Sequence, residues 1–157
     1  MKIYITGSSG SGKTTYANKV AGELKIPLYK TDDFYNEKEK RMFTVEEIKK
    51  VVKIDSDWII EGAYYIPEYV KAADKVIYLQ IGVLETVSRI LKRWFSNPEI
   101  RKKFSFLSTV KLCFTTIKDR YSSEGIDLNT DIPRHYKEKD RFNLCKANAK
   151  KLIVIRM

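Results

Sequence analysis

Cysteine is scarce in this sequence of 157 residues, which contains two, Cys113 and Cys145. They stand far apart and form no Cys-x-x-Cys pair. Cys113 lies within the apolar run Leu112-Cys113-Phe114. A pair of separated cysteines without a motif is typical of buried thiols in a reducing compartment rather than of a disulfide framework. We therefore expect two free, buried thiols and a cytoplasmic location.

Long apolar runs are also missing. No segment approaches the ~18 apolar residues of a membrane-spanning helix, and the first apolar stretch, residues 3–5, is too short for the core of a signal peptide. Repeats, low-complexity segments and linkers are absent as well. Because the length fits one domain, we predict a single domain over residues 1–157 with no membrane partner.

Acidic residues are outnumbered. Thirty Lys and Arg stand against 20 Asp and Glu, which gives a formal net charge of +10. Such an excess attracts polyanions, whether nucleic acid, phosphorylated metabolites or anionic lipid, although solvated helix faces would explain it equally well. Helix-turn-helix, zinc-finger and RNP patterns are missing. The charge alone therefore does not identify a partner.

Short apolar runs alternate with helical patterns along the chain. We expect strands at residues 2–6, 27–29, 58–60, 75–81 and 151–155, and helices at 13–24, 44–53, 83–95, 104–121 and 136–150. The strands are apolar throughout rather than alternating, which indicates a parallel sheet covered on both faces. The sequence thus predicts a three-layer α/β fold with a five-stranded parallel sheet. The apolar side chains of helix 83–95 should face inward, namely Val83, Leu84, Val87, Ile90, Leu91, Trp94 and Phe95.

The first strand runs into a complete G-x4-G-K-[ST] motif, the P-loop, at residues 7–14. Its glycines let backbone amides turn toward an anion, and the N-terminus of the next helix adds positive charge. Lys13 can reach the β- and γ-phosphates, and the Thr14 hydroxyl can bind magnesium. We therefore predict binding of ATP with Mg²⁺ by Gly7, Ser8, Ser9, Gly10, Ser11, Gly12, Lys13, Thr14 and Thr15.

Carboxylates follow two further strands. Asp32 and Asp33 come after the second strand, and Glu61 ends the third. Ligands of parallel sheets bind beyond the carboxyl ends of the strands, so these acids should face the P-loop. An acid there can take a proton from an acceptor hydroxyl or hold magnesium. We expect Asp32, Asp33 and Glu61 to contact the acceptor and Glu61 to join Thr14 at the metal. A turn or helix-cap role for the aspartates stays open.

Arg89 and Arg93 lie four residues apart on helix 83–95, so both project to one side. Arginine can stack on a base and grip phosphate oxygens. The next stretch contains Asn97-Pro98 and the basic run 101–103, which together resemble a mobile cationic lid at about residues 94–106. A solvated basic face is the alternative.

Together these residues resemble the adenylate-kinase-like P-loop kinases, most strongly over residues 1–95. Asp32-Asp33-Phe34-Tyr35 is similar to the Asp-x-Phe-Tyr of uridine-kinase-type enzymes, in which the Asp is the base, and this points to Asp32. Ile60-Glu61-Gly62 looks like their third-strand signature. Arg89-x-x-x-Arg93 resembles the first lid arginines of adenylate kinases, of which one packs on adenine and the next meets phosphate.

The glycine motif, Trp58-Ile59-Ile60-Glu61-Gly62 and the Arg89–Arg93 segment are also similar to the bacterial DNA topology modulation proteins. The resemblance implies an adenylate/shikimate-kinase-like fold and an ATP-dependent phosphotransferase with Lys13, Asp32, Arg89 and Arg93 as catalytic residues. Its acceptor would be a small molecule, a nucleoside or nucleotide by resemblance. A second Gly-rich signature for shikimate is missing. The alternative is a nucleotide-regulated nucleic-acid-binding protein.

Overall fold

Five parallel strands form the central sheet of the computed structural model, which describes residues 1–8, 10–121, 132 and 136–156. The strand order is β2-β5-β1-β6-β7, and each neighbouring pair is parallel. The predicted five-stranded parallel sheet is therefore confirmed. The strands are β1 (Lys2–Gly7), β2 (Leu28–Lys30), β5 (Trp58–Glu61), β6 (Lys75–Gln80) and β7 (Leu152–Arg156).

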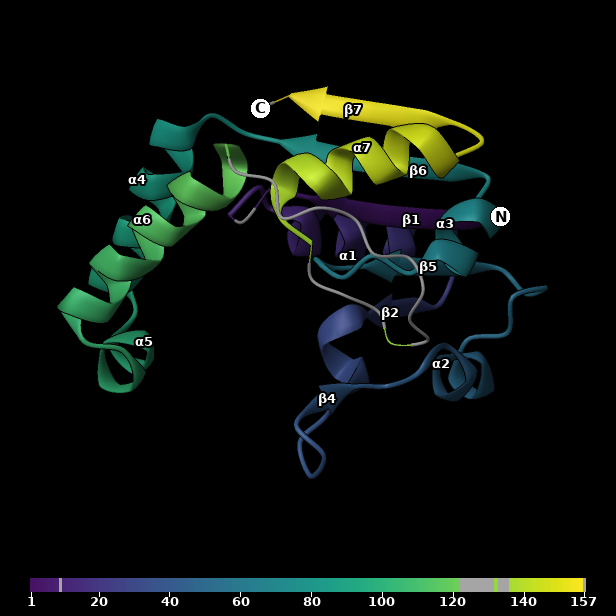
Figure 1. Ribbon diagram of the computed structural model, residues 1–157, viewed down its shortest axis with the longest axis horizontal. Coiled ribbons are helices and arrows are strands. Elements are labelled where there is room, and N and C mark those ends of the chain that lie inside the picture. The colour runs from purple at the N-terminus through teal and green to yellow at the C-terminus, as the bar shows by residue number, and fades with distance from the viewer. Residues whose placement is uncertain (9, 122–131, 133–135, 157) are drawn as a thin grey trace.

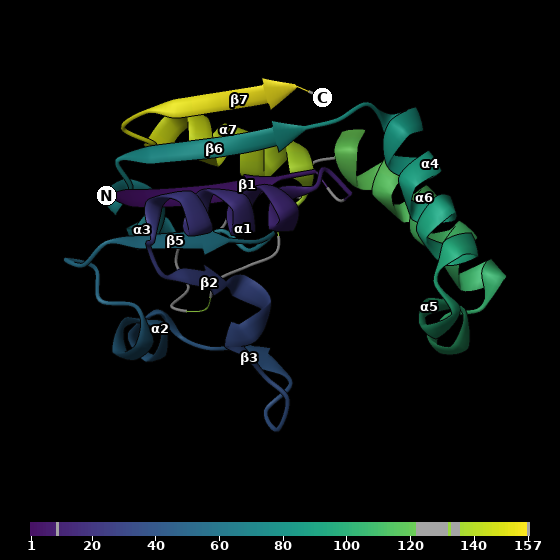
Figure 2. The same ribbon diagram turned by 180° about the vertical axis from the view of Figure 1, so that it is seen from behind.

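Helices cover both faces of this sheet (Figures 1 and 2). Ile3 and Ile5 of β1 pack in one buried cluster with Ala17 of α1 (Lys13–Leu24). Tyr4, between them, packs on the other side in a cluster that includes Leu144 of α7 (Glu138–Asn148) and residues of α3 (Pro67–Ala72). Alternate residues of one strand thus enter different cores, as they must when successive side chains point to opposite faces. The three predicted layers are confirmed.

The connection between β2 and β5 contains more structure than the sequence indicated. A 3₁₀ turn, η1 (Thr31–Phe34), leads into a hairpin of β3 (Tyr35–Asn36) and β4 (Arg41–Met42). Helix α2 (Val45–Val51) follows, and a capping box between Thr44 and Glu47 begins it. The hairpin and α3 were not predicted, because two-residue strands and a six-residue helix are too short to show a periodicity.

Helices α4 (Val83–Ser96), α5 (Pro98–Lys103) and α6 (Phe106–Tyr121) form an arm beyond the carboxyl ends of the strands (Figures 1 and 2). We call these three helices the helical arm. The predicted lid, residues 94–106, comprises the end of α4, all of α5 and the start of α6. Asn97 ends α4 and caps α5 through its side chain, with Pro98 in the first turn, which is a favourable position for proline.

The prediction that all seven apolar side chains of helix 83–95 face inward is wrong for two of them. Leu84 is 87% exposed and Phe95 58% exposed. Val87 and Leu91 instead line a crevice between α4 and α6, opposite Cys113. The helix is amphipathic as predicted, but its apolar stripe packs on a neighbouring helix rather than on the sheet. Periodicity shows that a face is covered, not what covers it.

The described part of the chain contains no helix with the length and apolar character needed to cross a membrane.

Candidate functional site

The P-loop joins β1 to α1 at the carboxyl edge of the sheet, as expected. Gly7 ends β1 with a φ of 150°, and a Cβ at this position would lie 2.0 Å from the carbonyl oxygen of Leu79 on β6. Glycine therefore allows the loop to start directly against the neighbouring strand. Gly12 caps α1 with a φ of 77°, so the helix N-terminus begins at Lys13. Ser9, also predicted to bind ATP, lies outside the described residues.

Lys13 is half-buried at the centre of the site rather than a surface side chain. Its Nζ donates to the Ser8 carbonyl oxygen at 3.3 Å. Burial lowers the pKa of Lys13, and the positive charge of Arg141 adds to this effect, whereas Glu61, Asp32 and Glu138 oppose it. Burial here thus disfavours the ammonium charge, which an anionic phosphate would stabilise.

Glu61 and Thr14 lie next to each other. Glu61 is 5% exposed at the end of β5 and shares a hydrogen bond with the Thr14 side chain. Burial raises the pKa of Glu61, although the nearby Lys13 lowers it. A hydroxyl and a carboxylate are oxygen ligands that magnesium accepts. Among the described residues no three acidic, histidine or cysteine side chains gather into a metal site, so a magnesium ion here would draw further ligands from nucleotide phosphates and water.

Asp32 faces this pair from the adjacent strand. It is exposed in η1, directly after β2, and interacts electrostatically with Lys13, Glu61 and Tyr64. Gly62 makes the close approach possible, because a Cβ there would lie 1.6 Å from the Oγ1 of Thr31. The end of β2 can therefore pack against the end of β5 only if this residue is glycine. Asp33 is exposed on the same turn.

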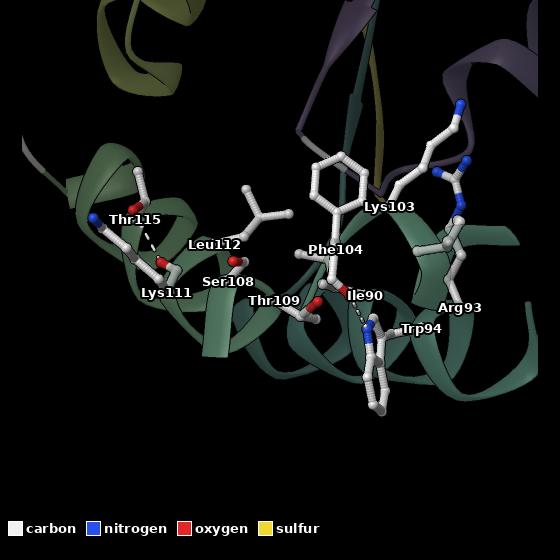
Figure 3. Close-up of a pocket in the computed structure, with 11 residues that line it drawn as sticks. Ile90, Arg93, Trp94, Lys103, Phe104, Ser108, Thr109, Lys111, Leu112 and Thr115 are labelled. Atoms are coloured by element: carbon white, nitrogen blue, oxygen red, sulfur yellow. Dashed lines mark hydrogen bonds between the residues drawn. The ribbon is translucent and has the colours of Figure 1, made fainter. Parts of the chain in front are cut away.

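The two predicted lid arginines lie in different places. Arg89 donates from Nη1 to the Gly10 carbonyl oxygen at 3.1 Å and from Nε to Glu85 at 2.7 Å, so it is held on the P-loop. Arg93, one turn further along α4, lines a pocket of about 730 Å³ in the helical arm, together with Lys103 of α5 (Figure 3). Arg93 and Lys103 thus share one hollow, formed where the end of α4, α5 and the start of α6 meet.

Sequence reasoning missed two side chains of α7 that contact the P-loop. The Ser8 hydroxyl donates to Glu138 Oε1 at 2.6 Å, and Arg141 donates from Nη2 to the Gly7 carbonyl oxygen at 2.9 Å. The sequence contains no signal for these contacts. A helix was expected at residues 136–150, but its partners lie more than a hundred positions earlier, and only the folded topology brings them together.

The raised pKa of Glu61 predicts a stability effect. A buried carboxyl with a raised pKa holds its proton more tightly in the folded protein, so stability falls as pH rises above the ordinary carboxyl value of ~4.3. Glu61→Gln removes this ionisation. We therefore expect the nucleotide-free variant to melt at a higher temperature than the wild type at pH 7 and at the same temperature near pH 4, as followed by circular dichroism.

Glu23→Gln on the exposed face of α1 is the matched control and should leave the pH dependence unchanged. A Glu61→Gln variant that melts below the wild type at pH 7 would show that the ionised carboxylate stabilises the nucleotide-free protein, contrary to this prediction.

Comparison with known proteins supports the fold. A shikimate kinase from Caldicellulosiruptor bescii is 28% identical over 149 residues, which cover 83% of this chain and 86% of the relative. A shikimate kinase from Acinetobacter baumannii, solved in complex with shikimate, superposes with a TM-score of 0.53 at 20% identity and covers 99% of this chain and 84% of its own. Deoxyadenosine kinase from M. mycoides with bound dATP also superposes with a TM-score of 0.53, at 14% identity, and the match covers 99% of this chain and 90% of the kinase chain.

No protein-family model matches the chain. The structural likenesses show that the chain has the α/β fold of P-loop kinases, in agreement with the predicted adenylate/shikimate-kinase-like architecture.

Proposed function

We propose that this protein is an ATP-dependent kinase that transfers the γ-phosphate to a small-molecule hydroxyl. One observation carries the proposal. Asp32, Glu61 and the P-loop residues Lys13 and Thr14 come from the ends of three adjacent strands and interact with one another. At this edge of the sheet they would provide a phosphate site, two magnesium ligands and a base, the parts that phosphoryl transfer requires.

In the proposed complex the P-loop amides and Lys13 hold the ATP phosphates. Arg89 lies on the loop at Gly10, where its guanidinium can reach the nucleotide. Magnesium, bound by Thr14 and Glu61 with the phosphates, would neutralise charge on the β- and γ-phosphates. Since the transition state of phosphoryl transfer is stabilised mainly by position and charge, these residues provide most of the catalysis.

Asp32 is the proposed base. It is exposed beside Glu61 and Tyr64, so an acceptor hydroxyl can reach its carboxylate. Arg93 and Lys103, which line the same pocket of the helical arm, would approach the transferring phosphoryl group when the arm closes as a lid. Closure would also exclude water and so limit ATP hydrolysis.

For the acceptor we propose a nucleoside. Two tyrosines border Asp32: Tyr64 is half-buried and interacts electrostatically with both Asp32 and Tyr35, which is partly exposed. Phenol rings next to a carboxylate suit a planar base linked to a sugar hydroxyl. Two relatives are named shikimate kinase, but the second Gly-rich signature for shikimate is missing from this sequence.

The acceptor is tested with a panel of nucleosides, nucleotides, shikimate and gluconate, each incubated with protein and Mg·ATP. We expect a phosphorylated nucleoside, identified by mass spectrometry and made in proportion to the ADP released. Phosphorylation of shikimate would support the proposed kinase activity and would contradict the proposal that the acceptor is a nucleoside. ATP consumption without any phosphorylated product across the panel would count against the kinase.

The nucleic-acid alternative and the resemblance to the DNA topology modulation proteins stay predictions. Exposed Arg101, Lys102 and Lys103 on α5 are the cations to neutralise in testing them. Binding of DNA that weakens with this triple substitution and shows a shallower salt dependence would support that alternative.

A further inference from the structure

Arg141 is the most deeply buried cation of the proposed site. It is 3% exposed, and within the described part of the chain its guanidinium has carbonyl partners but no ion pair. Burying a charge without an opposite charge is costly, and an apolar side chain of similar size would fill the same space more cheaply. A contribution to core stability alone therefore does not account for an arginine here.

The carbonyl groups that Arg141 contacts belong to the two sides of the proposed site. Nη2 donates to Gly7, the first residue of the P-loop, at 2.9 Å. Nη1 donates at 2.9 Å to Ala63, which follows Glu61 and Gly62 on the acceptor side, and at 3.2 Å to Tyr136 just before α7. The guanidinium of Arg141 thus joins the start of the P-loop to residues 61–65, which we call the acceptor loop.

The guanidinium is suited to this role because its N–H groups point in fixed, diverging directions. A lysine ammonium has three N–H donors, but all three are on a single nitrogen. A lysine therefore cannot donate to the carbonyl oxygens of Gly7 and Ala63 with the same geometry. A second contact supports the same junction, since Glu138, one turn earlier on α7, accepts from the Ser8 hydroxyl at 2.6 Å. Helix α7 therefore holds the first two residues of the P-loop from one side.

We propose that Arg141 is a positioning residue that fixes the distance between the ATP phosphates and the acceptor loop at residues 61–65. Its effect on phosphoryl transfer rests on the proposed kinase function, whereas its coupling of the two loops does not. A displacement of about 1 Å between reacting groups can reduce a reaction rate ~10²-fold. Arg141 can therefore have a large effect on the rate of phosphoryl transfer without contacting a substrate. The positive charge of Arg141 also lowers the pKa of Lys13, and this electrostatic effect is separate from the positioning of the two loops.

The coupling is tested with Mg·ATP as the only ligand. In the wild type, Mg·ATP should slow amide hydrogen exchange both in residues 7–14 and in residues 61–65, by about tenfold if local opening limits exchange. In Arg141→Met the P-loop should still be protected by ATP, but residues 61–65 should exchange at their nucleotide-free rate. Lys146→Met, on the exposed face of the same helix, is the control and should behave as wild type.

Arg141→Lys keeps the positive charge but removes the diverging N–H donors of the guanidinium. We expect it to bind ATP with nearly wild-type affinity, measured by calorimetry, and still to lose the protection of residues 61–65. If Arg141→Met does not fold, this variant carries the test. Full protection of residues 61–65 in a folded Arg141 variant would overturn the proposal, as would a wild type in which ATP never protects that loop.

Transfer to a phosphorylated acceptor gives the second readout. Arg141→Lys should lower kcat for transfer by ~10²-fold while changing the KM for ATP little, and should raise the ratio of ATP hydrolysis to transfer. A merely structural role would lower the melting temperature and leave that ratio unchanged, which would overturn the proposal. If no acceptor is found but the exchange result holds, the kinase proposal fails and the role of Arg141 stands.

Discussion

Lys13→Ala should abolish ATP turnover while the protein stays folded. In the proposed complex the side chain supplies a charge beside the transferring phosphoryl group, and a single such charge accelerates transfer by ~10³-fold or more. Its removal should not destabilise the protein measured without nucleotide, because burial already disfavours the ammonium there and lowers its pKa. We expect an unchanged or higher melting temperature together with the loss of activity in a coupled ADP-release assay.

Lys19→Ala is the matched control, because Lys19 lies on the same helix with its side chain 74% exposed. It should retain wild-type turnover. A Lys13→Ala protein that unfolds, or one that keeps most of its activity, would contradict the role given to this lysine.

Asp32→Asn should reduce phosphoryl transfer by about 10²–10⁴-fold, the usual contribution of a positioned general base. Asparagine keeps the shape of the side chain but cannot accept the acceptor proton. ATP affinity should change little, because the P-loop and Arg89 supply the phosphate contacts. Calorimetry with Mg·ATP and single-turnover transfer to the acceptor measure the two quantities separately.

Asp33→Asn is the neighbouring control, since Asp33 is exposed on the same turn and carries the same charge. Its transfer rate should stay within a few-fold of wild type. Equal losses in both variants would mean that the turn acts through its total charge. Unaltered transfer in Asp32→Asn, with an acceptor that the wild type phosphorylates, would remove the catalytic assignment.

The features that the sequence predicted are those that local patterns determine. Gly7–Thr14 follows an apolar strand and precedes a helix, and both its place and the sheet order agree with a parallel α/β fold. Because all parallel strands point the same way, Asp32 and Glu61 could be placed near Lys13 before any contact was known. The resemblance to uridine-kinase-type enzymes favoured Asp32 over Asp33, and in the structure Asp32 interacts electrostatically with Lys13 and Glu61.

The features that the sequence did not predict depend on long-range packing. The apolar stripe of α4 was assigned to the core, whereas it faces α6, since a stripe carries no information about its partner. Arg141 is 134 positions from Gly7. Nothing in its neighbourhood on α7 indicates that its side chain enters the protein rather than solvent, where most arginines lie.

The distance in sequence between Gly7 and Arg141 also has a consequence during biosynthesis. A ribosome adding about 5–20 residues per second exposes the complete glycine motif on the order of ten seconds before it adds the arginine that binds the Gly7 carbonyl. Until then the two backbone carbonyls of Gly7 and Ala63 have no guanidinium between them. A nascent chain therefore carries the glycine motif without the junction that α7 supplies, and we expect Mg·ATP to protect residues 61–65 only in chains that include α7.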